Sequence, residues 1–170
     1  MENRFIIPVK LIKDKGYTQG NVEDDIITTT LRRVQDINLR TILGTTFFKR
    51  LLTGVKDNDL TVDEVTLIDD YIAPYLIAKV DHRITNHLAF EIRSKTVGTA
   101  DDQYIKTSDA GNMLKLQDDL RSDANSYKNT LIGYLKDNCL LFDEYNNYIC
   151  NFENVSPDKE QGGDVAVSFI

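Results

Sequence analysis

The stretch that decides the fold is LRTILGTTFFKRLLTG, residues 39–54, where one apolar pattern stops and another begins at once. Apolar residues in helical order run up to Leu43, and Gly44 follows directly. Glycine just past the last turn readily adopts the left-handed conformation that ends many helices, so we expect Gly44 to cap the first helix. Phe47 and Phe48 then restart the apolar pattern. The stretch therefore predicts two helices joined by a tight corner, with both phenylalanines in a shared core.

On the N-terminal side of this corner, the apolar spacing predicts a long helix from about residue 22 to residue 43. Ile27, Leu31 and Val34 recur at steps of three or four residues, which places them on one helical face. Asn21 is the expected N-cap, because a short polar side chain can accept a hydrogen bond from the first free amides of a helix.

On the C-terminal side, a shorter helix is expected to end near Gly54, with the hydroxyl of Thr45 or Thr46 as its cap. A third helix is predicted further on. There Thr61 and Glu64 have the spacing of a capping box, in which each side chain bonds the backbone amide of the other residue.

Two longer helices are predicted in the second half of the chain. Pro74 lacks an amide hydrogen and clashes with the preceding turn, so Ala73 and Pro74 are expected to open a fresh helix that runs to about Arg93. A connection at residues 94–111 leads to a last helix at about 112–137. The residues expected on the inner faces are Val65, Ile68, Ile72, Ile77, Val80, Ile84, Leu88 and Ile92, and in the last helix Met113, Leu116, Leu120, Ala124, Tyr127, Leu131 and Leu135.

The two ends of the chain differ from this helical middle. Residues 4–12 are expected to form an extended arm, because Pro8 cannot donate a ladder hydrogen bond. The segment CLLFDEYNNYICNF that follows Asn138 is aromatic and is expected to lie across the bundle end. The sequence thus predicts an all-α bundle of about four to five helices in residues 1–150, with an extended N-terminal arm, followed by a flexible linker and apolar tail in residues 151–170.

The last residues, DVAVSFI, alternate like a strand and end on an apolar residue. Such a segment can add a strand to a neighbour's sheet edge or fill an apolar groove on another protein. It can equally fold back on its own domain and pair with residues 4–12, and the sequence leaves both readings open. In the first reading the interface residues of the tail are Val165, Val167, Phe169 and Ile170.

Composition limits the classes of function. The chain has 170 residues, the usual size of one domain, and a net charge of −7, which argues against a general grip on nucleic acid or anionic lipid. No apolar window is long enough to span a membrane, and the start resembles no signal peptide. We therefore expect a protein of the cytoplasm, or of a particle assembled there, in which Cys139 and Cys150 are free thiols.

Residues with catalytic or metal-binding chemistry are few. His82 and His87 lie five residues apart on one helix and so diverge, with His87 expected in the core and His82 facing water. Adjacent carboxylates point about 100° apart on a helix, so they are expected to be solvated rather than paired for acid–base work. These pairs are Asp24-Asp25, Asp69-Asp70, Asp101-Asp102 and Asp118-Asp119. The sequence predicts no catalytic residue, no metal site and no cofactor.

The order of these segments resembles the small head–tail connector (adaptor) proteins of tailed bacteriophages, especially those of crAss-like phages. The resemblance covers residues 5–148 and rests on packing motifs. These are FIIPVKLIK, INLRTILGTTFFKRLL with its Ile-x-x-x-Leu-Gly-x-x-aromatic corner, YIAPYLIAKVDHRI, and the closing LIGYLKDNCLLFDEY. The DVAVSFI tail lies outside it.

The resemblance implies a virion structural protein and not an enzyme. Such connectors form a homo-oligomeric ring, commonly of twelve copies, below the portal at the tail vertex. The ring extends the DNA channel, with DNA only as cargo, and docks other ring or tail proteins; no membrane is involved. On this interpretation Leu43, Gly44, Phe47 and Phe48 form a structural corner, and the 94–111 connection either lines the channel or reaches the next ring.

Two other classes of function remain open from the sequence. One is an enzyme whose site would converge on His87 or on a cysteine of shifted acidity. The other is a cytoplasmic helical adaptor or regulatory binding module unrelated to virions.

Overall fold

The computed structural model of the chain describes residues 5–17, 22–96 and 107–145, and the statements about structure below concern these residues. Every regular element among them is helical, which confirms the predicted all-α class. The elements are α1 (Val9–Lys15), α2 (Asp24–Arg33), a π-helical segment (Val34–Leu39), α3 (Arg40–Leu43), α4 (Thr45–Asp57), α5 (Val62–Thr66), a second π-helical segment (Leu67–Ile72), α6 (Ala73–Thr96), α7 (Thr107–Asp137) and a 3₁₀ turn (Cys139–Leu141).

Several of these elements run on without a break, so the described residues form four longer helical rods and the short α1. The rods span residues 24–43, 45–57, 62–96 and 107–137, as expected for a bundle of four to five helices. The first rod starts at Asp24 with Glu23 in the N-cap position, so the prediction of Asn21 as the N-cap is wrong. The predicted domain boundary after residue 150 lies outside the described residues.

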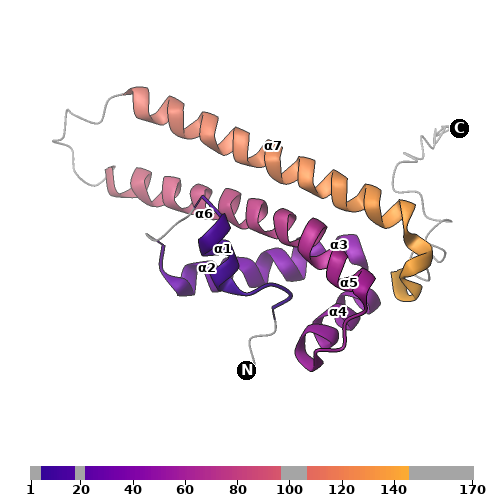
Figure 1. Cartoon of the computed structure of the whole chain (residues 1–170). Coiled ribbons are helices and arrows are strands. Elements are labelled where there is room, and N and C mark those ends of the chain that lie inside the picture. Colours follow the sequence, from indigo (N-terminus) through magenta and orange to yellow (C-terminus); the bar gives the residue numbers. More distant parts are fainter. Residues whose placement is uncertain (1–4, 18–21, 97–106, 146–170) are drawn as a thin grey trace, which may run out of the picture.

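Helix α6 is the central rod. Helix α7 packs antiparallel along one side of α6, and α2 with its π segment packs on another side, while α1 lies across α2 and α6 (Figure 1). Helices α4 and α5 close the bundle at the end where α7 stops. At the opposite end, α6 and α7 extend together beyond α1 and α2 (Figure 1). We call this α6–α7 pair the hairpin.

The corner at residues 43–45 is present, and its details differ from the expectation. Gly44 has φ 76° and ψ 160°, so φ is positive as predicted, but ψ lies far from the left-handed helical region. Gly44 ends α3, with its amide bonded to the Arg40 carbonyl at 3.0 Å, and it also begins α4. The predicted threonine cap is wrong, because no side chain caps α4, and Thr45 Oγ1 accepts from Arg40 Nε instead.

Helix α4 is longer than the sequence suggests. It continues past Gly54 to Asp57 and ends where Asn58 takes the left-handed conformation, with φ 54° and ψ 42°. Asparagine tolerates this conformation because its short polar side chain can bond locally. The extra turn brings Arg50 opposite the start of α5.

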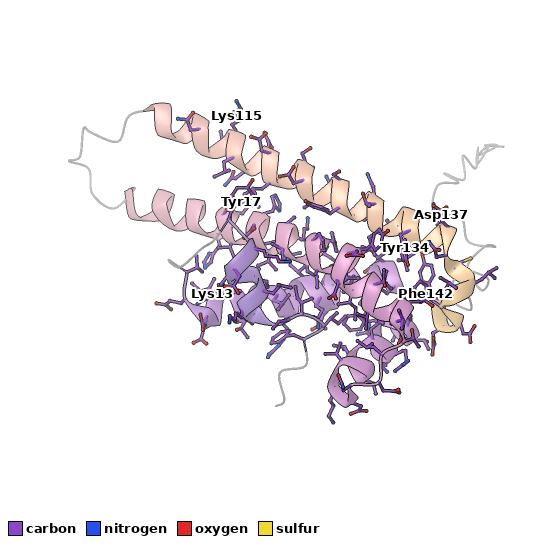
Figure 2. All side chains as sticks on the ribbon, in the orientation of Figure 1. Lys13, Tyr17, Lys115, Tyr134, Asp137 and Phe142 are labelled. Carbon is purple, nitrogen blue, oxygen red and sulfur yellow. The ribbon has the colours of Figure 1, made fainter. Side chains whose placement is uncertain are left out.

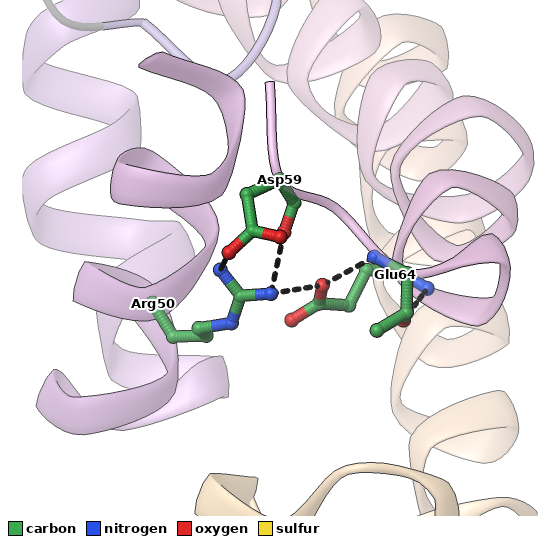
Figure 3. A network of polar contacts seen from close by, with 4 residues as sticks. Arg50, Asp59 and Glu64 are labelled. Atoms are coloured by element: carbon green, nitrogen blue, oxygen red, sulfur yellow. Dashed lines mark hydrogen bonds and ion pairs between the residues drawn. The ribbon is translucent and has the colours of Figure 1, made fainter. Parts of the chain in front are cut away.

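Arg50 joins α4 to α5 through a polar network (Figure 3). Its Nη2 donates to the backbone carbonyl of Asp59 at 2.6 Å and to the buried carboxylate of Glu64 at 2.9 Å. The same Glu64 oxygen accepts from the Thr61 amide, and Thr61 Oγ1 accepts from the Glu64 amide, which confirms the predicted capping box. This network fixes the angle at which the third rod starts.

Pro74 does not open a separate helix, so that prediction is wrong. The rod is continuous from Val62 to Thr96, and the turn before the proline is π-helical, with the Ala73 amide bonded to the Ile68 carbonyl five residues back. A π turn holds one more residue in each hydrogen-bonded ring than an α turn. The wider turn gives the proline ring room where a regular α-helix would clash.

The N-terminal arm is extended only up to Pro8. Helix α1 begins directly after it at Val9, so the prediction of an extended segment through residue 12 is wrong. Proline suits the start of a helix because a helix's first amides have no partner inside the helix. Ile6 and Ile7 are buried, and the Ile6 amide donates to Oε1 of the buried Gln35 at 2.9 Å.

Aromatic rings close the bundle at the corner, as the sequence predicts for the segment after Asn138. Phe47 is fully buried, and its ring lies 5.2 Å from that of Phe142 and 6.0 Å from that of Tyr145, measured between centroids. Tyr134, near the end of α7, stacks on Tyr71 at 3.9 Å (Figure 2). These contacts join the end of α7 to α4 and to the second π segment.

Most of the predicted core is buried, and four residues are exceptions. His87, Leu116 and Tyr127 are exposed although their spacing predicts an inward face, and so is Val65 on α5. His87 belongs to the second half of α6 and Leu116 to the first half of α7. These halves lead to the end of the hairpin that extends past α1 and α2 (Figure 1). The side chains of Leu88, Ile92 and Met113 are outside those that the structure describes.

The connection predicted at residues 94–111 is shorter at both ends, because α6 reaches Thr96 and α7 begins at Thr107. Residues 97–106 lie outside the described residues, as do Asp101, Asp102 and Cys150. Cys139 is a free thiol, as expected. The described carboxylate pairs at 24–25, 69–70 and 118–119 are exposed, which confirms the expectation for them.

Candidate functional site

The residues singled out by the sequence fall into two groups. Leu43, Gly44, Phe47 and Phe48 meet at the corner, where all four are buried, and they act there as structural residues. The tail residues Val165, Val167, Phe169 and Ile170 lie outside the described residues. The remaining candidate sites lie on the surface of the bundle.

One cavity opens on the side of the hairpin next to α1. It has a volume of about 310 Å³ and is lined by the end of α1, by α6 and by α7. Its lining combines apolar groups with tyrosines and charges: Lys15, Tyr17, Pro74, Ile77, Ala78, Asp81, Leu120, Asp123 and Tyr127. Tyr17 projects from the end of α1 toward the hairpin (Figure 2) and is 76% exposed.

Asp81 forms the floor of this cavity and has a structural task. The side chain is buried, and its Oδ2 accepts from the Tyr17 amide at 2.9 Å. Gly16 makes the approach possible, because a Cβ at that position would lie 2.9 Å from both Asp81 oxygens and 2.6 Å from the Ile12 carbonyl oxygen. The carboxylate thus ties the end of α1 to α6.

The opposite side of the hairpin is basic. Lys79, His82 and Arg83 follow each other at helical spacing on α6, and Arg121 and Lys128 lie seven residues apart on α7. Arg83 Nη2 donates to Asn38 Oδ1 at 3.1 Å, which places this side next to the first π segment. We call these five residues the basic side.

Repulsion among the cations of the basic side contributes to the pKa values of two of its residues, Lys79 and His82. Burial and the charges of Arg83, Lys128 and Arg121 lower the pKa of Lys79. Burial and the charges of Lys79, Arg121 and Arg83 lower the pKa of His82 below its ordinary value of 6.5. Lys79 and His82 therefore lie among positive charges, and no carboxylate is among the causes of their pKa shifts.

His82 is half-buried, which corrects the expectation that it faces water, as the exposure of His87 corrects the expectation of a core histidine. Its Nε2 lies 3.3 Å from the Asn86 amide nitrogen, and its Nδ1 is buried without a hydrogen-bond partner. Protonation at Nδ1 would add an unpaired donor in a basic surrounding.

We expect stability to fall as the pH drops through about 6.5, because unfolded His82 takes up a proton there while the folded protein resists it. The His82→Gln variant should lose part of this slope. The melting temperature at pH 7.5 and at pH 5.5 measures the effect. His87→Gln, which removes an exposed histidine from the same helix, is the matched control. An unchanged slope in His82→Gln would contradict the assignment of this pH dependence to His82.

The hydroxyls of two tyrosines in the bundle have raised pKa values. Burial raises the pKa of the Tyr75 hydroxyl to about 12, and burial followed by the charge of Tyr71, Asp63 and Asp70 raises that of Tyr134. Within residues 5–17, 22–96 and 107–145 no group of three or more histidine, cysteine or carboxylate side chains could hold a metal ion. In the same part of the chain no helix is long and apolar enough to span a membrane.

The sequence predicted neither the cavity nor the basic side. Both follow from the docking of α1 and α7 on α6, which brings together residues that are 40 or more positions apart. One pattern in the sequence could have indicated these surfaces. A cation and a carboxylate stand two residues apart in Lys79-Val80-Asp81 and again in Arg121-Ser122-Asp123.

Comparison with known proteins places the second and larger part of the chain in one family. The family DUF6712, described as a family of unknown function, matches residues 39–154, from just before the corner to beyond the closing aromatic segment. A search of curated proteins and a search of solved structures found no significant match.

Proposed function

The chain belongs to the DUF6712 family of unknown function, and from this premise we propose that it is a virion structural protein, a head–tail connector of a tailed bacteriophage. In this role copies of the chain form a ring below the portal, extend the DNA channel and dock tail proteins. The protein acts by binding other polypeptides and is not an enzyme. It is assembled in the host cytoplasm and resides at the tail vertex of the virion.

One observation carries the structural part of this proposal. The buried polar or charged side chains of the described residues are Gln35, Glu64 and Asp81. Each accepts a hydrogen bond from a backbone amide. Gln35 accepts from the Ile6 amide at 2.9 Å, Glu64 from the Thr61 amide at the start of its helix at 2.8 Å, and Asp81 from the Tyr17 amide at 2.9 Å. Buried polar groups are costly unless they are paired. Here the three side chains join separate segments of the bundle and have a structural task.

The shape of the bundle suits a subunit that repeats around an axis. The corner at Gly44 and the aromatic cluster around Phe47 thicken one end, and the hairpin projects from the other end (Figure 1). A rigid wedge of this kind can make the same head-to-tail contact with each neighbour, and such contacts close into a ring when the rotation per copy divides the circle.

Charge and surface composition support the proposed partners. A net charge of −7 disfavours adhesion to the phosphate backbone, which suits a protein through which DNA passes only as cargo. Leu140 and Leu141 are 80% and 53% exposed at the bundle end, just before the C-terminal segment. Exposed apolar groups of this kind favour contacts with the portal or with other ring and tail proteins.

Removal of residues 154–170 is expected to leave the bundle folded and to weaken assembly. The last described core residue is Tyr145, which precedes the truncated segment, so the truncation removes no described core residue. Circular dichroism should show an unchanged melting temperature, while the amount of truncated protein in purified particles should fall. Incorporation at the wild-type level would contradict a tethering role of Val165, Val167, Phe169 and Ile170.

Deletion of the gene in the phage that encodes it tests the proposal as a whole. A connector is needed between the filled head and the tail, so the deletion should yield heads without tails, and supply of the protein from a plasmid should restore complete particles. Tailed, infectious particles without the protein would contradict the proposal and favour a helical adaptor unrelated to virions.

A further inference from the structure

The hairpin carries opposite charges on its two sides. On α6, Lys79 and Asp81 are two residues apart, and on α7 Arg121 and Asp123 are also two residues apart. Two residues of an α-helix turn through about 200°, so on each helix the cation and the carboxylate point in nearly opposite directions. Lys79 and Arg121 interact electrostatically on the one side, and Asp81 and Asp123 line the same cavity on the other.

The basic side lacks counter-charges. In the described part of the chain Lys79, Arg121 and Lys128 form no ion pair with a carboxylate. Burial and then the charges of Arg83, Lys128 and Arg121 lower the pKa of Lys79. An anionic surface that docked there would remove this repulsion.

The acidic side offers such a surface on α7. Asp119 and Asp123 lie four residues apart on one helical face, and both are exposed. Leu116, 43% exposed, and Tyr127, 46% exposed, stand one turn before and one turn after the two carboxylates. We call these four residues the acidic side. Charged groups framed by exposed apolar side chains are typical of a surface that meets another protein.

We propose that the basic side of one copy docks on the acidic side of a second copy, so that the hairpins of successive copies associate head to tail. The two surfaces are different and complementary, which is the condition for a heterologous contact that repeats from copy to copy. The biological role of this contact rests on the proposed connector function, in which it joins neighbours in the ring.

A second copy fits the basic side better than a nucleic acid does. A second copy supplies the exposed carboxylates of Asp119 and Asp123 together with the side chains of Leu116 and Tyr127, and a phosphate backbone has no such apolar groups. The net charge of −7 also opposes approach to a polyanion as a whole. Charge complementarity across an interface selects the partner and rejects like-charged surfaces.

Two reversed variants test the contact. Arg121→Glu with Lys128→Glu places carboxylates on both sides of α7, and Asp119→Lys with Asp123→Lys places cations on both sides of α7. Each variant alone would then place like charges against each other. In an equimolar mixture, every contact between the two variants again pairs opposite charges.

Sedimentation velocity at low salt and increasing protein concentration gives the readout. We expect the wild type to associate, each variant alone to associate at least about tenfold more weakly, and the mixture to recover the wild-type behaviour. The substituted side chains are exposed, so all three proteins should share one melting temperature by circular dichroism. Added salt should weaken association of the wild type and of the mixture.

Several outcomes would overturn the inference. These are a mixture that stays monomeric, variants that associate alone as the wild type does, and a wild type that stays monomeric throughout. Binding of duplex DNA that the Arg121→Glu, Lys128→Glu variant loses, together with a mixture that stays monomeric, would assign the basic side to phosphate. The gene deletion tests the connector function separately. If association recovers in the mixture while the deletion still yields tailed particles, the contact between copies is retained and its role in a ring is rejected.

Discussion

Replacement of Phe47 by alanine is expected to lower the free energy of unfolding by about 3–5 kcal/mol, the usual cost of deleting a buried aromatic side chain. The Phe47 ring is fully buried and lies 5.2 Å from the ring of Phe142 and 6.0 Å from that of Tyr145. Its loss opens a cavity at the place where α4 meets the end of α7. Urea unfolding followed by circular dichroism measures the change.

Leu140→Ala is the matched control, because Leu140 belongs to the same closing segment and is 80% exposed. Surface substitutions of this kind usually change stability by no more than about 0.5 kcal/mol. A Phe47→Ala protein as stable as the Leu140→Ala protein would show that the aromatic cluster does not join α4 to α7.

Gly44→Val is expected to cost about 3 kcal/mol, the second large effect. Gly44 has φ 76° and ψ 160°, a combination that is essentially restricted to glycine. A β-branched side chain resists positive φ more than any other kind. Because α3 ends and α4 begins at this residue, relaxation of the strain would change the angle between the two helices.

The control for this substitution is Gly133→Ala on α7. A Cβ at Gly133 would meet no atom within 4 Å, so alanine should raise stability by about 0.5–1 kcal/mol through its better helix propensity. Differential scanning calorimetry of both variants gives the comparison. Equal melting temperatures for Gly44→Val and the wild type would refute the assigned corner.

The helical class and most of the core were predictable from the sequence because they depend on local spacing. The step from Leu43 to Phe47 predicts the corner, and the spacing of Thr61 and Glu64 predicts the capping box that the structure contains. Both signals lie within a few residues, so no knowledge of distant contacts is needed to read them.

The departures from the prediction have longer-range causes. The π turn that accommodates Pro74 leaves no signature in the hydrophobic pattern, and neither does the π turn that presents Gln35 to the amide of Ile6. His87 and Leu116 have the spacing of core residues, but both are exposed. They belong to the halves of α6 and α7 that lead to the end of the hairpin beyond α1 and α2 (Figure 1). Local spacing predicts which residues share a face and cannot predict where a neighbouring helix ends.

The charged surfaces of the hairpin were predictable only in part. Lys79 and Asp81, like Arg121 and Asp123, must point in opposite directions on any helix. Only the packing of α7 on α6 shows that the two cations fall on the same side and that the two carboxylates line one cavity. The fold thus converts a repeated pair of residues into two complementary surfaces.

An electron cryo-microscopy reconstruction of the tail vertex of the phage implied by the proposed connector function tests that proposal most directly. We predict a closed ring below the portal in which each copy fits the corner at Gly44 and the hairpin of α6 and α7. A vertex in which every ring is accounted for by other proteins would contradict the claim that this bundle serves as a connector.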